Sequence, residues 1–170
     1  LTFDPEKKVV NFVATGEEGN AVIAVRGANG KILWSWHIWA TDQPQEHYYV
    51  NSTGNYTVLD RNIGATRADA GSTDQERYES FGTMYQWGRK DPFGQTAASR
   101  VDLYKRLAAQ LSQDEAVNFP HLFVQNHTPW SSEMDYNFWA QNQKTIYDPC
   151  PVGYRVPPMD VWRGFTVDGE

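Results

Sequence analysis

The sequence predicts an α+β fold in which strands outnumber helices. Aromatic residues make up 14% of the 170 residues, and 13 Gly and 9 Pro divide the chain into short stretches. Domains built from many short strands typically fill their cores with large rings and form their turns with Gly and Pro. One stretch, residues 99–112, carries apolar residues at the spacing of three and four that is typical of a helix. We therefore expect many short strands with helices in the minority.

Composition argues against two classes of partner. The chain has 15 Lys and Arg against 21 Asp and Glu, a net charge of −6, whereas non-specific binding of nucleic acid needs clustered positive charge. No apolar run approaches the roughly 20 residues that span a bilayer, so we expect no direct membrane insertion. Because the chain begins at Leu1 without an initiator Met or a signal-like stretch, we expect a processed protein or a fragment.

Residues 1–54 are predicted to form a small antiparallel β region. Three stretches rich in β-branched and aromatic residues, 9–14, 21–26 and 31–39, are separated by the turn-forming sequences TGEEGN and GANG. The Asn-Gly dipeptide at 29–30 predicts a hairpin between the second and third of them. Apolar residues occupy both faces of the third strand, which indicates either burial on both sides or a face that meets the following domain.

Residues 55–170 are predicted to form a second domain, which follows a polar connector over residues 41–55. We expect these elements in chain order: a strand over 56–65, a charged loop over 67–80, an aromatic strand over 81–88, the helix over 99–112, an extended segment over 118–124, and a Trp-rich loop over 129–143. No internal repeat or low-complexity tract interrupts this order.

The only cysteine, Cys150, lies between Pro149 and Pro151. A single cysteine cannot form an internal disulfide or supply the several thiolates of a structural zinc site. A catalytic cysteine needs a nearby cation or helix N-terminus and a positioned histidine, and all four histidines are far away in the sequence. The two prolines restrict the backbone on either side, so we interpret Cys150 as a buried, unreactive residue at a rigid corner.

Two groups of residues could hold a metal ion, but neither has the spacing of a known site. The candidate zinc ligands are His37, Asp42, Glu46 and His47, and the candidate calcium ligands are Asp69, Asp74, Glu76 and Glu79. The first group lies in a polar connector, and the second lacks the regular alternation of an EF-hand loop. We therefore predict no metal site, no cofactor and no catalytic residue.

The Trp-rich loop is the candidate ligand-binding site. Flat rings and amide groups occur together there, a mixture that sugar or protein ligands can use. The candidate binding residues are Trp130, Tyr136, Asn137, Trp139, Gln141 and Asn142. The alternative is that both tryptophans pack inward and pin the loop.

Three blocks of sequence resemble a known family. YTVLDRNIGATRA, FGTMYQWGRKDPF and KTIYDPCPVGYRVP, in this order, are similar to repeated blocks of surface-exposed proteins of Bacteroides and its relatives. These proteins carry the Fibrobacter succinogenes major paralogous domain, which is often found in fimbrillin-like proteins. The resemblance implies an exported, non-catalytic adhesion or ligand-recognition module at the outer membrane or on fimbriae. Its partners would be a glycan or protein on host or neighbouring cells, and other fimbrial subunits.

A more remote resemblance implies the fold. CPVGYRVPPMDVW is similar to a signature of C-type-lectin-like domains, including those of the formylglycine-generating enzyme group. In that signature a turn leads into a buried strand, and the tryptophan opens the following helix. The matching residues are Cys150, Gly153, Tyr154, Arg155, Pro157 and Trp162. The resemblance implies a C-type-lectin-like domain over residues 55–170, cut short at its C-terminus because the family's fold continues through further strands.

The chain departs from these relatives in ways that argue against two of their activities. It lacks the acidic triplets that bind calcium in lectins, and it lacks the paired cysteines of the formylglycine-generating enzymes. Three alternatives remain: an enzyme of the formylglycine-generating type, a carbohydrate-active accessory domain, and a purely structural fimbrial subunit. The N-terminal strands could donate or accept a strand in such a subunit.

Overall fold

Paired strands dominate the computed structural model, which describes residues 1–94, 105–125, 129–133, 135 and 138–164. The antiparallel pairs are β1 (Thr2–Asp4) with β2 (Val9–Asn11), β3 (Gly19–Arg26) with β4 (Ile32–Ala40), and β5 (Glu46–Asn51) with β6 (Gly54–Leu59); β7 (Lys105–Leu107) pairs with β8 (Leu122–Val124) in parallel. The helices are α1 (Asp74–Phe81), α2 (Gln113–Asn118) and the 3-10 helix η1 (Met159–Trp162). None of the helices in these ranges is long and apolar enough to cross a bilayer.

The predicted α+β fold with a C-type-lectin-like domain is wrong. The described residues are predominantly β, and their strands form separate two-stranded sheets with short helices between them. The physical reason is local: in the three antiparallel pairs, the strand-forming stretches are joined by short turns, so each closes on its neighbour in sequence. The short motifs behind the prediction specify a turn, and a turn can occur in many topologies.

The hairpin of β3 and β4 is the longest element and was correctly predicted. Its register runs from Gly19 opposite Ala40 to Arg26 opposite Ile32. The connecting turn is closed by a hydrogen bond from the Gly27 amide to the Lys31 carbonyl, 2.9 Å long, and Gly30 has a φ of 78°. Both faces of β4 meet residues far along the chain, because Trp34 packs against Tyr147 and the adjacent Ser35 bonds Asp91, and this explains why apolar residues occur on both faces.

The predicted polar connector over residues 41–55 is wrong in its second half, which forms β5 and the turn into β6. The side chain of Asn51 closes this turn, because its Oδ1 accepts hydrogen bonds from the amides of Thr53 (2.8 Å) and Gly54 (3.2 Å). The expected boundary between residues 54 and 55 falls at the start of β6. The division into two domains stays a prediction.

Helix positions were also misjudged. Residues 67–80, expected as a charged loop, contain most of α1, which begins with a capping box between Thr73 and Glu76. The expected strand over 81–88 forms only a bridge between Met84 and Phe93. The helix expected over 99–112 falls partly outside the described residues, and its described part contains β7. The extended segment over 118–124 is confirmed where it forms β8.

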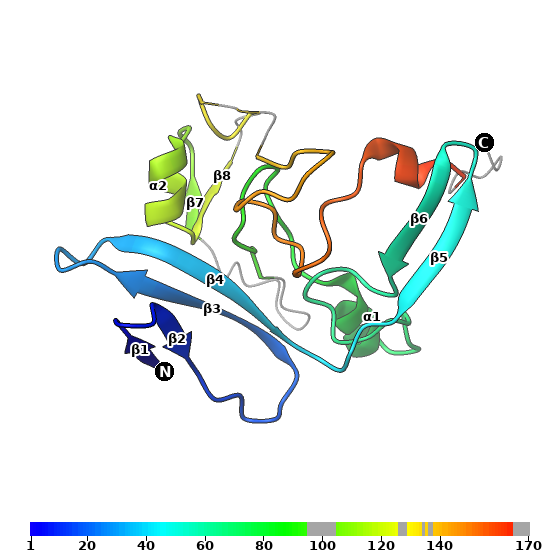
Figure 1. Ribbon diagram of the computed structural model, residues 1–170, viewed down its shortest axis with the longest axis horizontal. Coiled ribbons are helices and arrows are strands. Elements are labelled where there is room, and N and C mark those ends of the chain that lie inside the picture. The colour runs from blue at the N-terminus through cyan, green and yellow to red at the C-terminus, as the bar shows by residue number, and fades with distance from the viewer. Residues whose placement is uncertain (95–104, 126–128, 134, 136–137, 165–170) are drawn as a thin grey trace.

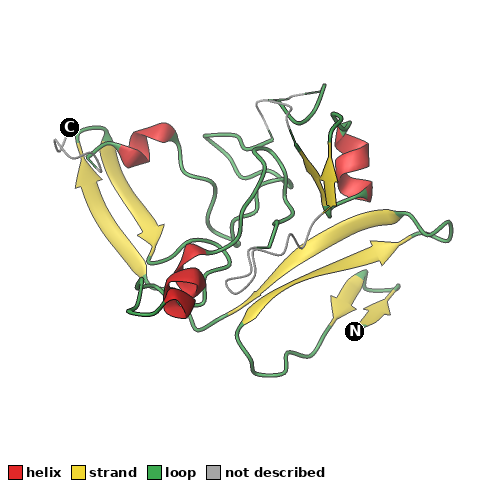
Figure 2. Cartoon of the chain, turned by 180° about the vertical axis from the view of Figure 1, so that it is seen from behind, coloured by secondary structure: helices red, strands yellow, loops and turns green. Residues whose placement is uncertain are grey.

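The hydrophobic core lies between α2, β8 and the segment after them. Its buried members are Leu111, Ala116, Val124, Trp130 and Phe138. Figure 1 shows α2, β7 and β8 above one end of β4, whereas β5, β6 and η1 lie at the opposite end of the molecule. The view from behind in Figure 2 shows the same separation, with long loops between the two ends.

Candidate functional site

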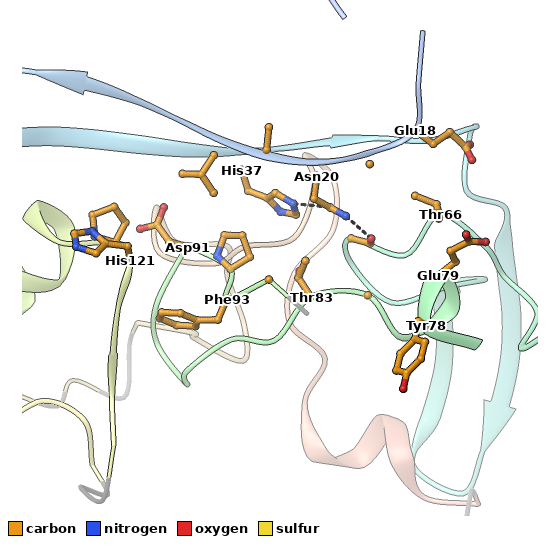
Figure 3. A pocket seen from close by; sticks show the side chains of 18 of the residues that line it. Glu18, Asn20, His37, Thr66, Tyr78, Glu79, Thr83, Asp91, Phe93 and His121 are labelled. Carbon is orange, nitrogen blue, oxygen red and sulfur yellow. Dashed lines mark hydrogen bonds between the residues drawn. The ribbon is translucent and has the colours of Figure 1, made fainter. Parts of the chain in front are cut away.

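A cleft of about 720 Å³ opens beside the β3–β4 hairpin. Figure 3 shows it between the strands above, α1 on one side and the segment around His121 on the other. Glu18 and the first residues of β3, up to Val22, contribute one wall. Tyr78 and Glu79 of α1 contribute another. Because these segments are distant in sequence, the cleft exists only in the folded chain.

A hydrogen-bonded chain of three side chains, Asn20, His37 and Tyr85, lies at the wall of the cleft that β3 and β4 form. Asn20 Nδ2 donates to the Gly64 carbonyl (2.7 Å), which orients its Oδ1 toward His37 Nε2 at 2.8 Å. Since the amide oxygen can only accept, Nε2 carries the proton and Nδ1 accepts from the Tyr85 hydroxyl at 3.0 Å. Burial lowers the pKa of His37 to about 4, so the imidazole is neutral at pH 7.

A buried ion pair lies next to this chain. Lys90 Nζ is 2.8 Å from Asp91 Oδ2 and 4.5 Å from the centroid of the Trp34 ring. Ser35 Oγ donates to Asp91 Oδ1 at 2.6 Å. Burial lowers the pKa of Lys90, and the Asp91 carboxylate opposes that shift. The charge of Asp91, which lines the cleft, is therefore already balanced.

Arg89 connects the core to the cleft. Its guanidinium donates to the carbonyl oxygens of Leu122 (2.5 Å), Ala116 (3.3 Å) and Phe119 (3.3 Å), the last two at the C-terminal end of α2. It also lies 5.0 Å from the centroid of the Phe93 ring, which lines the cleft. Burial lowers the pKa of Arg89 to about 10, so it stays charged at pH 7.

Two further carboxylates form an acidic end of the cleft, Glu18 and Glu79 (Figure 3). Glu18 Oε1 accepts from the Asp42 amide at 3.0 Å, and Glu79 Oε1 accepts from Gln75 Nε2 at 2.8 Å. Neither carboxylate forms an ion pair within the ranges that the structure describes. Each therefore keeps lone pairs that a ligand can use.

The structure places the expected binding loop mainly in the core. Trp130 is 4% exposed, and its indole donates to the Trp87 carbonyl at 2.5 Å. Trp139 is half-buried and donates to the Tyr147 carbonyl at 3.0 Å. These contacts favour the packing alternative for both tryptophans. Gln141 and Asn142 are exposed, whereas Tyr136 and Asn137 lie outside the described residues.

The block around Cys150 is held together by the buried Asp148 carboxylate. It accepts from the amides of Cys150 and Val156, both at 2.9 Å, and from Lys144 Nζ at 3.1 Å. Cys150 is half-buried, and burial, reinforced by Asp148, raises the pKa of its thiol to about 12. Cys150 is thus only partly buried, where full burial was expected, while its raised pKa is consistent with an unreactive residue at a corner.

The rest of this motif forms a turn without the expected strand. The Tyr154 amide donates to the Pro151 carbonyl at 3.0 Å, with Gly153 at a φ of 91°, and the Tyr154 hydroxyl donates to Glu46. Arg155 is exposed and Pro157 half-buried. Trp162 ends η1 and is 52% exposed, so the expectation that it opens a helix is wrong.

Several of the candidate metal ligands have other structural partners. His37 belongs to the chain described above, and Asp42 pairs with Arg61 at 2.5 Å. Glu76 accepts from the amides of Ser72 and Thr73, both at 2.8 Å, at the start of α1. Over the described ranges, no group of three or more His, Cys, Asp or Glu side chains could hold a metal ion.

Comparisons with protein-family models, curated proteins and solved structures find no match. The cleft had no signal in the sequence, because its residues come from separate segments and follow no motif. Only the clustering of Glu18, His37 and Asp91 in space distinguishes them from ordinary polar residues.

Proposed function

We propose that this chain is a non-catalytic recognition module of an exported bacterial surface protein, and that its ligand binds in the cleft. The observation that carries the proposal is the cleft itself, at about 720 Å³. This volume lies within the range of roughly 300–1,000 Å³ that is typical of ligand sites. The ligand would be a glycan or protein on a host or neighbouring cell.

The chemistry of the cleft supports binding over catalysis. A general base needs a lone pair that can reach a substrate and a pKa near the working pH. Both nitrogens of His37 are engaged in hydrogen bonds, and the Asp91 carboxylate is held by Lys90 and Ser35. The Cys150 thiol has a raised pKa, which disfavours the nucleophilic thiolate.

The location at the cell surface is supported by the three sequence blocks that resemble surface proteins. Two of these blocks contribute Arg89 and Asp148, whose hydrogen bonds organise the loops around the core.

Blocking the cleft tests this proposal. Ala21 is exposed and lines the cleft, so Ala21→Trp should fill the space without disturbing the core. The labelled chain would be tested on a glycan array and on intact epithelial and bacterial cells. We expect saturable binding by the wild-type chain, and a loss of at least about tenfold in affinity for the variant, because a bulky ring excludes the ligand from the site.

The matched control is Ala28→Trp in the β3–β4 turn, which is exposed and does not line the cleft. It should bind like the wild type, and both variants should keep the wild-type melting temperature. Equal binding by Ala21→Trp would place recognition elsewhere. If the wild-type chain binds no array or cell sample, a purely structural fimbrial role is favoured instead.

A further inference from the structure

We propose that the cleft takes the side chain of a Lys or Arg residue presented by a partner protein. This inference rests on the proposed function and names the chemistry that the cleft selects. Three properties of the lining support it: its hydrogen-bond acceptors, its carboxylates without ion-pair partners, and its apolar surface.

The acidic end of the cleft offers hydrogen-bond acceptors. Next to it, His37 Nε2 donates to Asn20 Oδ1, and one Asn20 Nδ2 proton is donated to the Gly64 carbonyl. Thr83 Oγ1 donates to the Ile63 carbonyl at 3.2 Å, and Gln75 Nε2 donates to Glu79. A carboxylate has about four lone-pair positions, so Glu18 and Glu79 can each accept more bonds. A ligand that supplies donors can therefore bind at this end of the cleft.

The charge balance favours a cation among the possible donors. No Lys or Arg lines the cleft in the part of the chain that the structure describes. Arg67 attracts Glu79 electrostatically, but its ion-pair partners are Asp69 at 2.9 Å and Glu76 at 3.4 Å. Asp91 is balanced by Lys90, which leaves Glu18 and Glu79 as the lining carboxylates without an ion-pair partner among the described residues.

The apolar part of the lining matches an alkyl stem. Ala21 and Val22 of β3, with Pro92 and Pro120, line the cleft beside the carboxylates. Lys and Arg bury their methylene stems on apolar surface while the charged tip meets an acceptor. A sugar ring carries hydroxyls on all sides, whereas this part of the lining is apolar surface beside two carboxylates. A basic side chain is therefore the better match.

The test compares small probes by their effect on backbone amide resonances of the full chain. Nα-acetyl-lysine methylamide and its arginine analogue are the cationic probes, and the norleucine analogue has the same stem without the charge. We expect the cationic probes to shift the amides of Glu18 to Val22 and of Glu79, with an affinity at least about tenfold above that of norleucine. Their binding should weaken as ionic strength rises.

Two conservative variants and a control test the carboxylates directly. Glu18→Gln and Glu79→Gln keep an oxygen for the existing hydrogen bonds and should each weaken binding of the lysine probe about five- to tenfold. Glu17→Gln, an exposed neighbour that does not line the cleft, should leave it unchanged.

Three outcomes would overturn the inference: equal shifts from the norleucine probe, stronger shifts from glucosamine than from the lysine probe, or no effect of either Gln variant. If the inference fails while Ala21→Trp still abolishes binding to arrays or cells, the cleft remains the recognition site for another ligand. If Ala21→Trp has no effect there, the proposed function of the cleft fails as well.

Discussion

His37 shows how a single residue is controlled by its surroundings. It lies in β4 with Asn20 on one ring nitrogen and Tyr85 on the other, and this arrangement suits only the neutral tautomer that donates from Nε2. Burial disfavours the imidazolium and Asp91 favours it, but burial is the larger effect. Protonation at Nδ1 would force Tyr85 to lose or reverse its hydrogen bond, whereas Nε2 would still donate to Asn20.

We predict that acid destabilises the chain through His37. Its pKa falls from 6.5 to about 4 on folding, so the unfolded chain takes up the proton first as the pH decreases. The stability is complete above about pH 6.5, is lost progressively toward pH 4, and changes by roughly 2 kcal/mol between pH 7 and pH 5. Urea unfolding at both pH values measures this loss.

The control for this prediction is His37→Gln, which keeps a donor and an acceptor but cannot titrate. Its unfolding free energy should fall less between pH 7 and pH 5 than that of the wild type. A histidine resonance titrating near pH 6.5 for His37 would contradict the prediction, because it would show that folding leaves the pKa unchanged.

At the scale of elements, short helices depend on their caps. α1 contains no buried residue, so packing contributes little, and its start is stabilised by reciprocal bonds between Thr73 and Glu76. Hydrogen bonds from the Thr73 and Ser72 amides lower the pKa of the Glu76 carboxyl to about 2. α2 has the same capping box at Ser112 and is further held at its other end by Arg89.

We predict that Thr73→Ala destabilises the chain by about 1 kcal/mol, because the amide of Glu76 loses its side-chain acceptor. Thr73→Ser keeps the hydroxyl and should stay close to the wild type. Chemical denaturation measures both values. Since Gln75, Tyr78 and Glu79 of α1 line the cleft, Thr73→Ala should also weaken ligand binding there. Equal stability of the Ala and Ser variants would show that the cap contributes nothing.

At the scale of the whole molecule, loops and side chains join the sheets. Each antiparallel strand pair is closed by its own turn, and strand side chains reach the loops and η1 through bonds such as Trp39 Nε1 to the Ala65 carbonyl at 2.9 Å and Asn51 Nδ2 to the Asp160 carbonyl at 2.9 Å. Trp130 and Arg89 link the core to residues 87–93, the last three of which line the cleft. Stability therefore depends on a few large side chains at these junctions.

We predict that Trp130→Ala destabilises the chain by about 3–5 kcal/mol, because a buried ring and its indole hydrogen bond are lost together. Trp139→Ala should cost less, since that ring is only half-buried. Thermal and urea unfolding of the two variants measure the difference. A Trp130→Ala variant that keeps its stability but loses ligand binding would restore the Trp-rich loop as the recognition surface.

Local sequence determined the parts of this protein that depend on neighbouring residues. Alternating apolar residues and a Gly turn specify the β3–β4 hairpin, and Gly153 specifies the turn after Cys150. The capping box of Thr73 and Glu76 was also present in the sequence as a Thr-x-x-Glu pattern, and it would have identified α1 as a helix. In each case the partners are only a few residues apart, so their pattern can be read directly.

Only the tertiary structure decided the fold and the candidate site. The sequence of a strand does not specify which other strand it pairs with, so separate two-stranded sheets could not be distinguished from one larger sheet. Trp130 could equally have formed a binding surface, and its burial depends on Leu111 and Phe138 meeting it in the core. The cleft joins Glu18 to Glu79 and Asp91 across long sequence separations, and no spacing rule connects residues whose contact is made by folding alone.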